Sequence, residues 1–161
     1  MDKFEILGKA LWLWSCSPLH SKWPLQSAVS YVIPAIEFNQ YSLLMGDDGM
    51  PRGWASWAWL DKSAQQRYIL NPNSLRYEDW KSGDRLWFID FISPFSFKDT
   101  IKLRRQMGKI HGDSYLARSI RLRSGGKAVI VEHSGGSVDV ARSKAMADEF
   151  YAEASEIFRK E

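Results

Sequence analysis

The stretch Trp87-Phe88-Ile89-Asp90-Phe91-Ile92 is apolar at every position except Asp90, which predicts a strand buried on both faces in the middle of a sheet. Strict alternation along the strand would turn Asp90 to the face of Phe88, opposite that of Trp87. A carboxylate in such a place is costly to remove from water unless another group pairs with it. Asp90 therefore needs a partner, and a turn, an arginine or a histidine could each supply one.

A histidine is offered by the stretch Ser17-Pro18-Leu19-His20-Ser21-Lys22-Trp23-Pro24, in which His20 lies in a polar loop between two prolines. Pro18 cannot continue the apolar helix before it, so His20 lies beyond the end of that helix. A histidine supported by a carboxylate is a common general base in enzymes. The two stretches suggest a His20–Asp90 pair, although spacing alone leaves the commoner partners of a buried aspartate open.

Hydrophobic periodicity and turn residues predict a mixture of helices and strands along the chain. Helices are expected over residues 4–15, 25–40, 61–70, 97–111 and 139–160, and strands over 41–45, 53–60, 87–92, 116–123 and 127–133. The buried stripe of the first helix is expected to hold Phe4, Leu7, Leu11 and Trp14, widened by Ile6, Ala10 and Leu13. Pro34 either kinks the second helix or begins a new one. Two hairpins and a central apolar strand favour an α+β fold, a single domain over residues 1–161 with a largely antiparallel sheet and helices on its faces.

The chain of 161 residues has a net charge of +3, but the charge is unevenly distributed. Between Lys98 and Lys127, nine Lys or Arg residues stand against Asp99 and Asp113, which gives +7 there and −4 elsewhere. This basic segment suits an acidic partner, or it is an ordinary solvated face. All eight Trp residues precede it, whereas a nucleic-acid site would interleave aromatic and basic residues. Nucleic acid is therefore not an expected partner.

Cysteine and histidine give no sign of a metal site. Cys16 is the only cysteine, which excludes an intramolecular disulfide, and the three histidines lack paired ligand spacing. His111 and His133 are expected to be surface or hydrogen-bonded structural residues. Gly125-Gly126 and Gly135-Gly136 look like turns and fit no phosphate-binding fingerprint. No stretch has the length of a membrane span or the character of a secretion leader, which predicts a cytoplasmic protein without stable membrane anchoring.

A series of short motifs, spread in order along the chain, resembles one enzyme family. The motifs are Leu7-Gly8, Trp12-Leu13-Trp14, Ser17-Pro18-Leu19-His20, Trp23-Pro24, Pro34-Ala35-Ile36, Asn39-Gln40-Tyr41, Ser56-Trp57-Ala58, Glu78-Asp79-Trp80, Ser82-Gly83-Asp84-Arg85 and Trp87-Phe88-Ile89-Asp90. They resemble the RTX toxin-activating lysine acyltransferases of Gram-negative bacteria. The resemblance is highly specific from about residue 6 to 95 and continues more weakly through Arg118-Ser119-Ile120-Arg121 and Gly135-Gly136.

The resemblance implies a GNAT-like fold and the transfer of a fatty acyl group from acyl carrier protein to internal lysines of an RTX protoxin. It matches the essential His of the family with His20, its Asp with Asp90 and a nearby Ser with Ser17. It implies no cofactor besides the acyl-acyl carrier protein co-substrate. The chain departs from the family at Pro94-Phe95-Ser96, where Pro-Phe-Gly is common. The resemblance therefore does not predict the backbone conformation of this loop. The Gln/Arg-x-x-Gly-x-Gly/Ala loop that holds pyrophosphate in CoA-using GNAT enzymes is absent, in agreement with a carrier-protein donor.

Two other functions remain open. One is a GNAT-type N-acyltransferase that uses acyl-CoA, which the missing loop disfavours. The other is a non-catalytic module that binds a toxin or nucleic acid through the basic segment. The sequence fixes neither the acyl chain length nor the oligomeric state, for which a homodimer is one alternative.

The expected chemistry begins with a lysine amine, whose deprotonation at pH 7 costs about 4.6 kcal/mol. His20 would take this proton as the amine attacks the thioester, or would itself carry the acyl group as an intermediate. Asp90 would hold the imidazole tautomer and stabilise the imidazolium. Ser17 would orient the thioester or stabilise its oxyanion, unless it is only a turn residue before Pro18.

Overall fold

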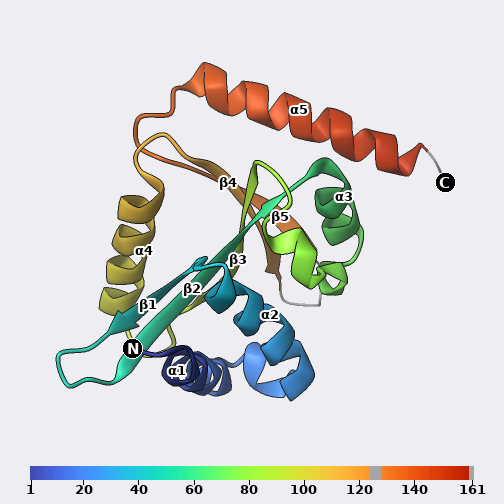
Figure 1. The fold of residues 1–161 in the computed structure, drawn as a ribbon. Coiled ribbons are helices and arrows are strands. Elements are labelled where there is room, and N and C mark those ends of the chain that lie inside the picture. Colours follow the sequence, from blue (N-terminus) through green and yellow to red (C-terminus); the bar gives the residue numbers. More distant parts are fainter. Residues whose placement is uncertain (124–127, 160–161) are drawn as a thin grey trace.

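The computed structural model describes residues 1–123 and 128–159 (Figure 1). Its helices are α1 (Lys3–Cys16), α2 (Leu25–Glu37), α3 (Lys62–Leu70), α4 (Phe97–His111) and α5 (Val140–Phe158), with short 3₁₀ helices η1 (His20–Lys22), η2 (Pro72–Ser74) and η3 (Tyr77–Trp80). Its strands are β1 (Tyr41–Met45), β2 (Pro51–Leu60), β3 (Arg85–Ile92), β4 (Leu116–Leu122) and β5 (Ala128–Ser134). Each predicted helix and strand is present to within a few residues. The turn predicted at residues 124–126 lies outside the described residues.

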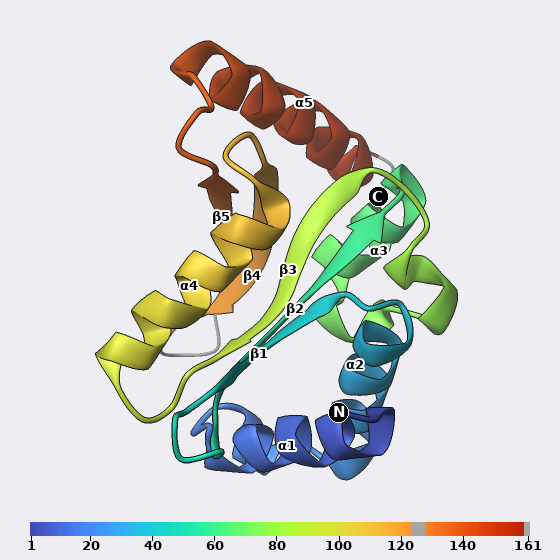
Figure 2. The same ribbon diagram turned by 60° about the vertical axis from the view of Figure 1, so that its left-hand side comes forward.

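The five strands form one sheet in the order β1-β2-β3-β4-β5, which confirms β3 as the central strand. Neighbouring strands are antiparallel except for β3 and β4, which are parallel. Helices α1, α2, α3 and α5 contribute to the core on one face of the sheet, and α4 covers the other face (Figure 1 and Figure 2). The α+β class and the largely antiparallel sheet are confirmed, and the arrangement is consistent with a GNAT-like fold.

The parallel contact between β3 and β4 is short. Leu86–Phe88 of β3 pair with Ala117–Ser119 of β4. Past these three pairs, residues 89–92 and 120–122 have no ladder partner on their facing edges within the part of the chain that the structure describes. The sheet is therefore split between β3 and β4 beyond Phe88.

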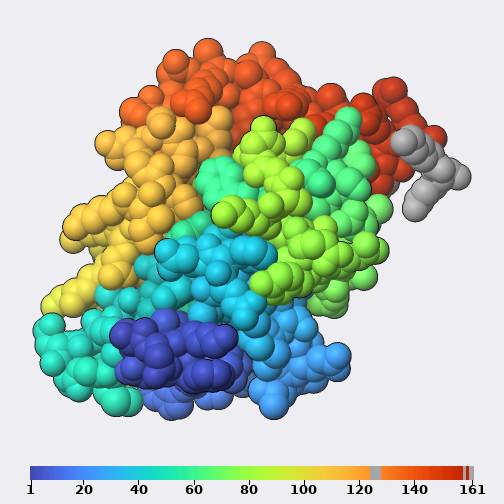
Figure 3. Space-filling model, viewed as in Figure 1, coloured from blue at the N-terminus to red at the C-terminus, as the bar shows by residue number. Residues whose placement is uncertain are grey.

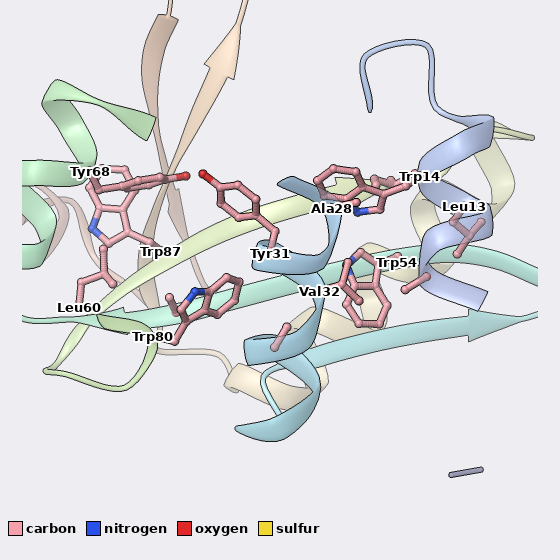
Figure 4. Close-up of a cluster of buried hydrophobic side chains, with 14 of the residues drawn as sticks. Leu13, Trp14, Ala28, Tyr31, Val32, Trp54, Leu60, Tyr68, Trp80 and Trp87 are labelled. Atoms are coloured by element: carbon pink, nitrogen blue, oxygen red, sulfur yellow. The ribbon is translucent and has the colours of Figure 1, made fainter. Parts of the chain in front are cut away.

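Most tryptophans are core residues. Trp54, Trp80 and Trp87 are fully buried, and Figure 4 shows them packed with Trp14 around helix α2. These side chains tie α1 and α2 to the middle of the sheet. In the space-filling view, α1 (dark blue) and α5 (red) lie at opposite ends of the same face (Figure 3).

Helix α1 buries part of its predicted stripe. Ile6, Ala10, Leu13 and Trp14 are buried as predicted, whereas Phe4 is 73% exposed. The predicted stripe is wider than the face of the helix that contacts α2 and the sheet. The prediction is therefore wrong at Phe4. In α2, Pro34 lies inside a helix that continues past it to Glu37.

Candidate active site

The loop after α1 is held by its own backbone. The Ser17 N–H donates to the carbonyl of Trp14 at 3.1 Å, and the Ser21 N–H donates to the carbonyl of Ser17 at 2.9 Å. His20 begins the 3₁₀ turn η1, and its carbonyl accepts from the Trp23 N–H at 2.9 Å. The imidazole lies between two indoles, 4.6 Å from the Trp14 ring centre and 5.2 Å from that of Trp23. These contacts leave the His20 side chain only 9% exposed, as expected for a fixed rather than a mobile loop.

A β-bulge aims Asp90 at this loop. On β2, Ser56 pairs with Asp90 and the next residue pairs with Phe88, so Ile89 is an extra residue on β3. The extra residue reverses the alternation, and Asp90 returns to the face of Trp87. The prediction that Asp90 shares the face of Phe88 is therefore wrong. The Ser56 hydroxyl accepts from the Asp90 N–H at 3.3 Å, which helps to hold the bulge in place.

The structure brings Ser17, His20 and Asp90 together. Ser17 Oγ lies 2.7 Å from His20 Nδ1, and His20 Nε2 lies 3.5 Å from Asp90 Oδ1. The Asp90 side chain is 5% exposed, and its second oxygen, Oδ2, has no hydrogen-bond partner among the described residues. Both imidazole nitrogens thus face a polar side chain, with a close contact on the Ser17 side and a looser one on the Asp90 side.

A cavity of about 480 Å³ opens beside His20 and Asp90. Its described lining comes from both faces of the sheet: Leu19, His20, Trp23, Tyr31, Tyr68, Pro72, Phe88, Ile89, Asp90, Phe91, Thr100, Arg104, Met107, Tyr115, Ser119, Ile120, Arg121, Leu122 and His133. Because β3 and β4 part beyond Phe88, the cavity passes through the sheet between them. Ser17 is not among the lining residues, so it lies behind the imidazole as seen from the cavity.

Comparison with known families shows which family the chain belongs to. A sequence model described as the RTX toxin acyltransferase family, HlyC, matches residues 1–133. This chain belongs to that family. The matched residues include His20, Asp90 and both strands that border the cavity, so the resemblance inferred from the sequence is confirmed.

Individual relatives carry the match over most of the chain. A protein-lysine myristoyltransferase, RtxC of Kingella kingae, is 44% identical over 154 residues, which cover 95% of this chain and 90% of that protein. A protein-lysine palmitoyltransferase, CyaC of Bordetella bronchiseptica, is 40% identical over 153 residues, covering 94% and 82%. A leukotoxin-activating lysine-acyltransferase, LtxC of Aggregatibacter actinomycetemcomitans, is 40% identical over 153 residues, covering 94% and 89%. The chain is therefore an acyltransferase.

Two tyrosines at the candidate site were not predicted from the sequence. Tyr31 of α2 and Tyr68 of α3 line the cavity, and Figure 4 shows their hydroxyl groups pointing toward one another. The Tyr31 hydroxyl donates to the carbonyl of Pro72. Burial, and then the Asp90 charge, raise the pKa of Tyr31 to about 12, and burial raises the pKa of Tyr68 further. Both phenols are therefore protonated donors at neutral pH.

The basic segment is less uniform than its composition indicates. Arg118 is buried, with Nη2 donating to the Met146 carbonyl at 2.8 Å and the guanidinium 4.3 Å from the Phe150 ring centre. It therefore joins β4 to α5. The exposed cations among the described residues of the segment are Lys98, Lys102, Arg104, Arg105, Lys109, Arg121 and Arg123. Lys127 lies outside the described residues.

The other two histidines are half-buried on the α4 face of the sheet. His133 Nε2 lies 2.9 Å from Ser119 Oγ, and His111 packs against Trp57 and Phe88. Burial lowers the pKa of both imidazoles. Among residues 1–123 and 128–159, no group of three or more His, Cys, Asp or Glu side chains could hold a metal ion. Within the same residues, no helix is both long and apolar enough to span a membrane.

Proposed function

We propose that this acyltransferase moves a fatty acyl group from acyl carrier protein to the ε-amine of internal lysines in an RTX protoxin, with His20 as the general base. The observation that carries the proposal is the Ser17–His20–Asp90 group at the wall of a cavity that passes through the sheet. The relatives in Kingella kingae and Bordetella bronchiseptica are named as protein-lysine myristoyl- and palmitoyltransferases, and the one in Aggregatibacter actinomycetemcomitans as leukotoxin-activating.

His20 Nε2 is the nitrogen that meets the substrate in this proposal. Ser17 lies away from the cavity, 2.7 Å from Nδ1. The proposal takes the tautomer in which Nδ1–H donates to Ser17 Oγ, which leaves Nε2 unprotonated beside Asp90. A lysine ammonium would approach Nε2 from the cavity, beside the Asp90 carboxylate, whose negative charge favours its approach. Nε2 would take one of its protons, at an intrinsic cost near 4.6 kcal/mol at pH 7 that Asp90 offsets by stabilising the imidazolium.

The freed amine then attacks the thioester carbonyl carbon. A C–N bond forms, the carbonyl electrons move to oxygen, and collapse of this intermediate breaks the C–S bond. The departing thiolate takes the proton held by His20. The new amide nitrogen then loses its second excess proton through His20 to water, so the enzyme returns to its starting state. Tyr68 lines the same cavity and keeps its proton, so we assign it, rather than Ser17, the stabilisation of the oxyanion.

Carrier protein as the donor is supported by charge. Helix α4 exposes Lys98, Lys102, Arg105 and Lys109, which suit an acidic protein surface and would speed its approach. The chain also lacks the glycine loop that would favour acyl-CoA. The expected cytoplasmic location is part of the same proposal.

Mass spectrometry of a protoxin fragment tests the function directly. Incubation with this enzyme and acyl-acyl carrier protein should add the acyl mass to internal lysines, and acyl-CoA should replace the carrier poorly. His20→Ala should abolish the transfer while circular dichroism stays unchanged, and Ser21→Ala, in the same loop but exposed, should retain it. Normal transfer by His20→Ala would refute the assignment. An acylated His20 trapped by rapid acid quench would replace direct attack by a covalent intermediate.

A further inference from the structure

The end of the cavity on the α4 face differs chemically from the end beside His20. Three α4 residues one turn apart, Thr100, Arg104 and Met107, line it, which places one stripe of the helix along the opening. Strand β4 adds Ser119 and Arg121, and β5 adds His133. Phe88 and Tyr115 also line the cavity on this face, but both arginines of the lining lie here. The α4 end is thus a basic mouth, here called the arginine mouth.

Two guanidinium groups at the arginine mouth are free to bind an anion. Arg104 and Arg121 are exposed, and neither makes an ion pair with any acidic group in the described part of the chain. Both act on His133, whose pKa is lowered first by burial and then by these two positive charges. The two arginines therefore converge on one place, although α4 and β4 are separate elements. Arginine forks match phosphate oxygens in geometry as well as in charge.

We propose that Arg104 and Arg121 bind the phosphate of the donor's 4′-phosphopantetheine arm, so that the donor enters through the arginine mouth and its thioester reaches His20 from the α4 face. The inference rests on the proposed function, since it takes a pantetheine thioester as the donor. His133 and Ser119 add hydrogen-bonding groups without a further positive charge. The open edges of β3 and β4 offer backbone groups to the amides of the arm. The same phosphate is present in acylated carrier protein and in acyl-CoA, so the site itself would accept either.

Donors with and without the phosphate provide the test. Acyl-4′-phosphopantetheine and acyl-pantetheine carry the same thioester and differ at the anion alone. Arg104→Gln and Arg121→Gln should each lower kcat/KM about tenfold with the phosphorylated donor, the size expected for one charge-assisted hydrogen bond. Neither substitution should change the rate with acyl-pantetheine. Arg123→Gln, two residues after Arg121 but off the cavity, should leave the rate with both small donors unchanged.

Binding without transfer separates this inference from the proposed function. Calorimetric titration of the wild-type enzyme should show 4′-phosphopantetheine binding at least tenfold more tightly than pantetheine, and the Arg104→Gln/Arg121→Gln double variant should lose that difference. If protoxin lysines stay unmodified with every donor but this preference is found, the phosphate site stands and the proposed reaction fails. Equal binding of the two compounds by the wild-type enzyme would overturn the inference. Equal loss of rate with both donors in a variant whose circular dichroism is unchanged would overturn it as well.

Discussion

Replacing Ser17 by alanine tests what holds the imidazole of His20, the proposed general base. The hydroxyl lies 2.7 Å from His20 Nδ1, in a place where both side chains are nearly excluded from water. Since Ser17 does not line the cavity, alanine removes a contact to His20 and leaves the substrate contacts intact. We expect a lower kcat with little change in KM, because the imidazole loses its orientation and its partner when it becomes charged.

The size of the effect follows from that one contact. A buried hydrogen bond to a group that becomes charged contributes about 1.5–3 kcal/mol. At about 1.36 kcal/mol per tenfold change in rate, kcat should fall roughly 10- to 150-fold. Ser17→Thr, which keeps the hydroxyl, should recover most of the loss. Ser15→Ala removes an exposed hydroxyl that donates to the Trp12 carbonyl, and it should have no effect on the rate.

The assay follows lysine acylation of a protoxin fragment by mass spectrometry at several concentrations of acyl-acyl carrier protein. Circular dichroism and melting curves should confirm that each variant is folded. A loss in Ser17→Ala as complete as that in His20→Ala would mean that Ser17 itself carries the acyl group. An unchanged kcat would mean that the hydrogen bond has no part in orienting His20. Either result would refute the reasoning.

Three further predictions concern charge, packing and pH. Asp90→Asn should lower the acylation rate at least about a hundredfold, while the melting temperature stays equal or rises. The variant loses a buried charge, and Asp90 Oδ2 has no hydrogen-bond partner among the described residues. A parallel loss of activity and stability would instead show that Asp90 has a structural role. Gly83→Ala should lower the free energy of unfolding in urea by about 1–3 kcal/mol or more, since its Cβ would lie 2.6 Å from the Leu60 carbonyl oxygen, whereas Gly8→Ala, with open space around it, should be neutral or stabilising. Burial lowers the pKa of His111 below the value near 6.5 that it has in the unfolded chain. The unfolded state therefore binds more protons, and the stability of the wild-type protein should fall as the pH drops below about 6.5. His111→Phe should reduce that fall in melting curves recorded at pH 5–7.

The central strand could be predicted from the sequence by a local rule, whereas the choice of His20 as the partner of Asp90 needed the family resemblance as well. Residues 87–92 are apolar on both faces, which only an interior strand can satisfy, and β3 lies in the middle of the sheet. A carboxylate in that strand needs a partner, and His20 lies 3.5 Å away. The catalytic roles of these residues and of Ser17 stay predictions until the variants are measured.

What the sequence could not predict depends on contacts between distant segments. Nothing in the pattern of β3 marks Ile89 as an extra residue, because the bulge arises from its register with β2. Tyr31 and Tyr68 lie on helices that look independent in the sequence and meet only through the folded core. Arg118 would be expected at the surface because arginine is charged, but the Phe150 ring of α5 covers it. Each of these is a tertiary effect that overrides a local pattern.

Only three residue pairs join β3 to β4, so we expect the sheet to deform more easily at this contact than within β1–β3 or β4–β5. Strands β1–β3 form one plate and β4–β5 the other, and within residues 1–123 and 128–159 the facing edges beyond the join have no ladder partner. A pantetheine arm lying in the gap would bridge the two plates and take up the free backbone groups along them. Hydrogen exchange of the amides in residues 120–122 should then slow when the arm is bound. The bound donor would then restrict motion between the two parts of the sheet, and the enzyme would be most rigid when its reacting groups must be aligned.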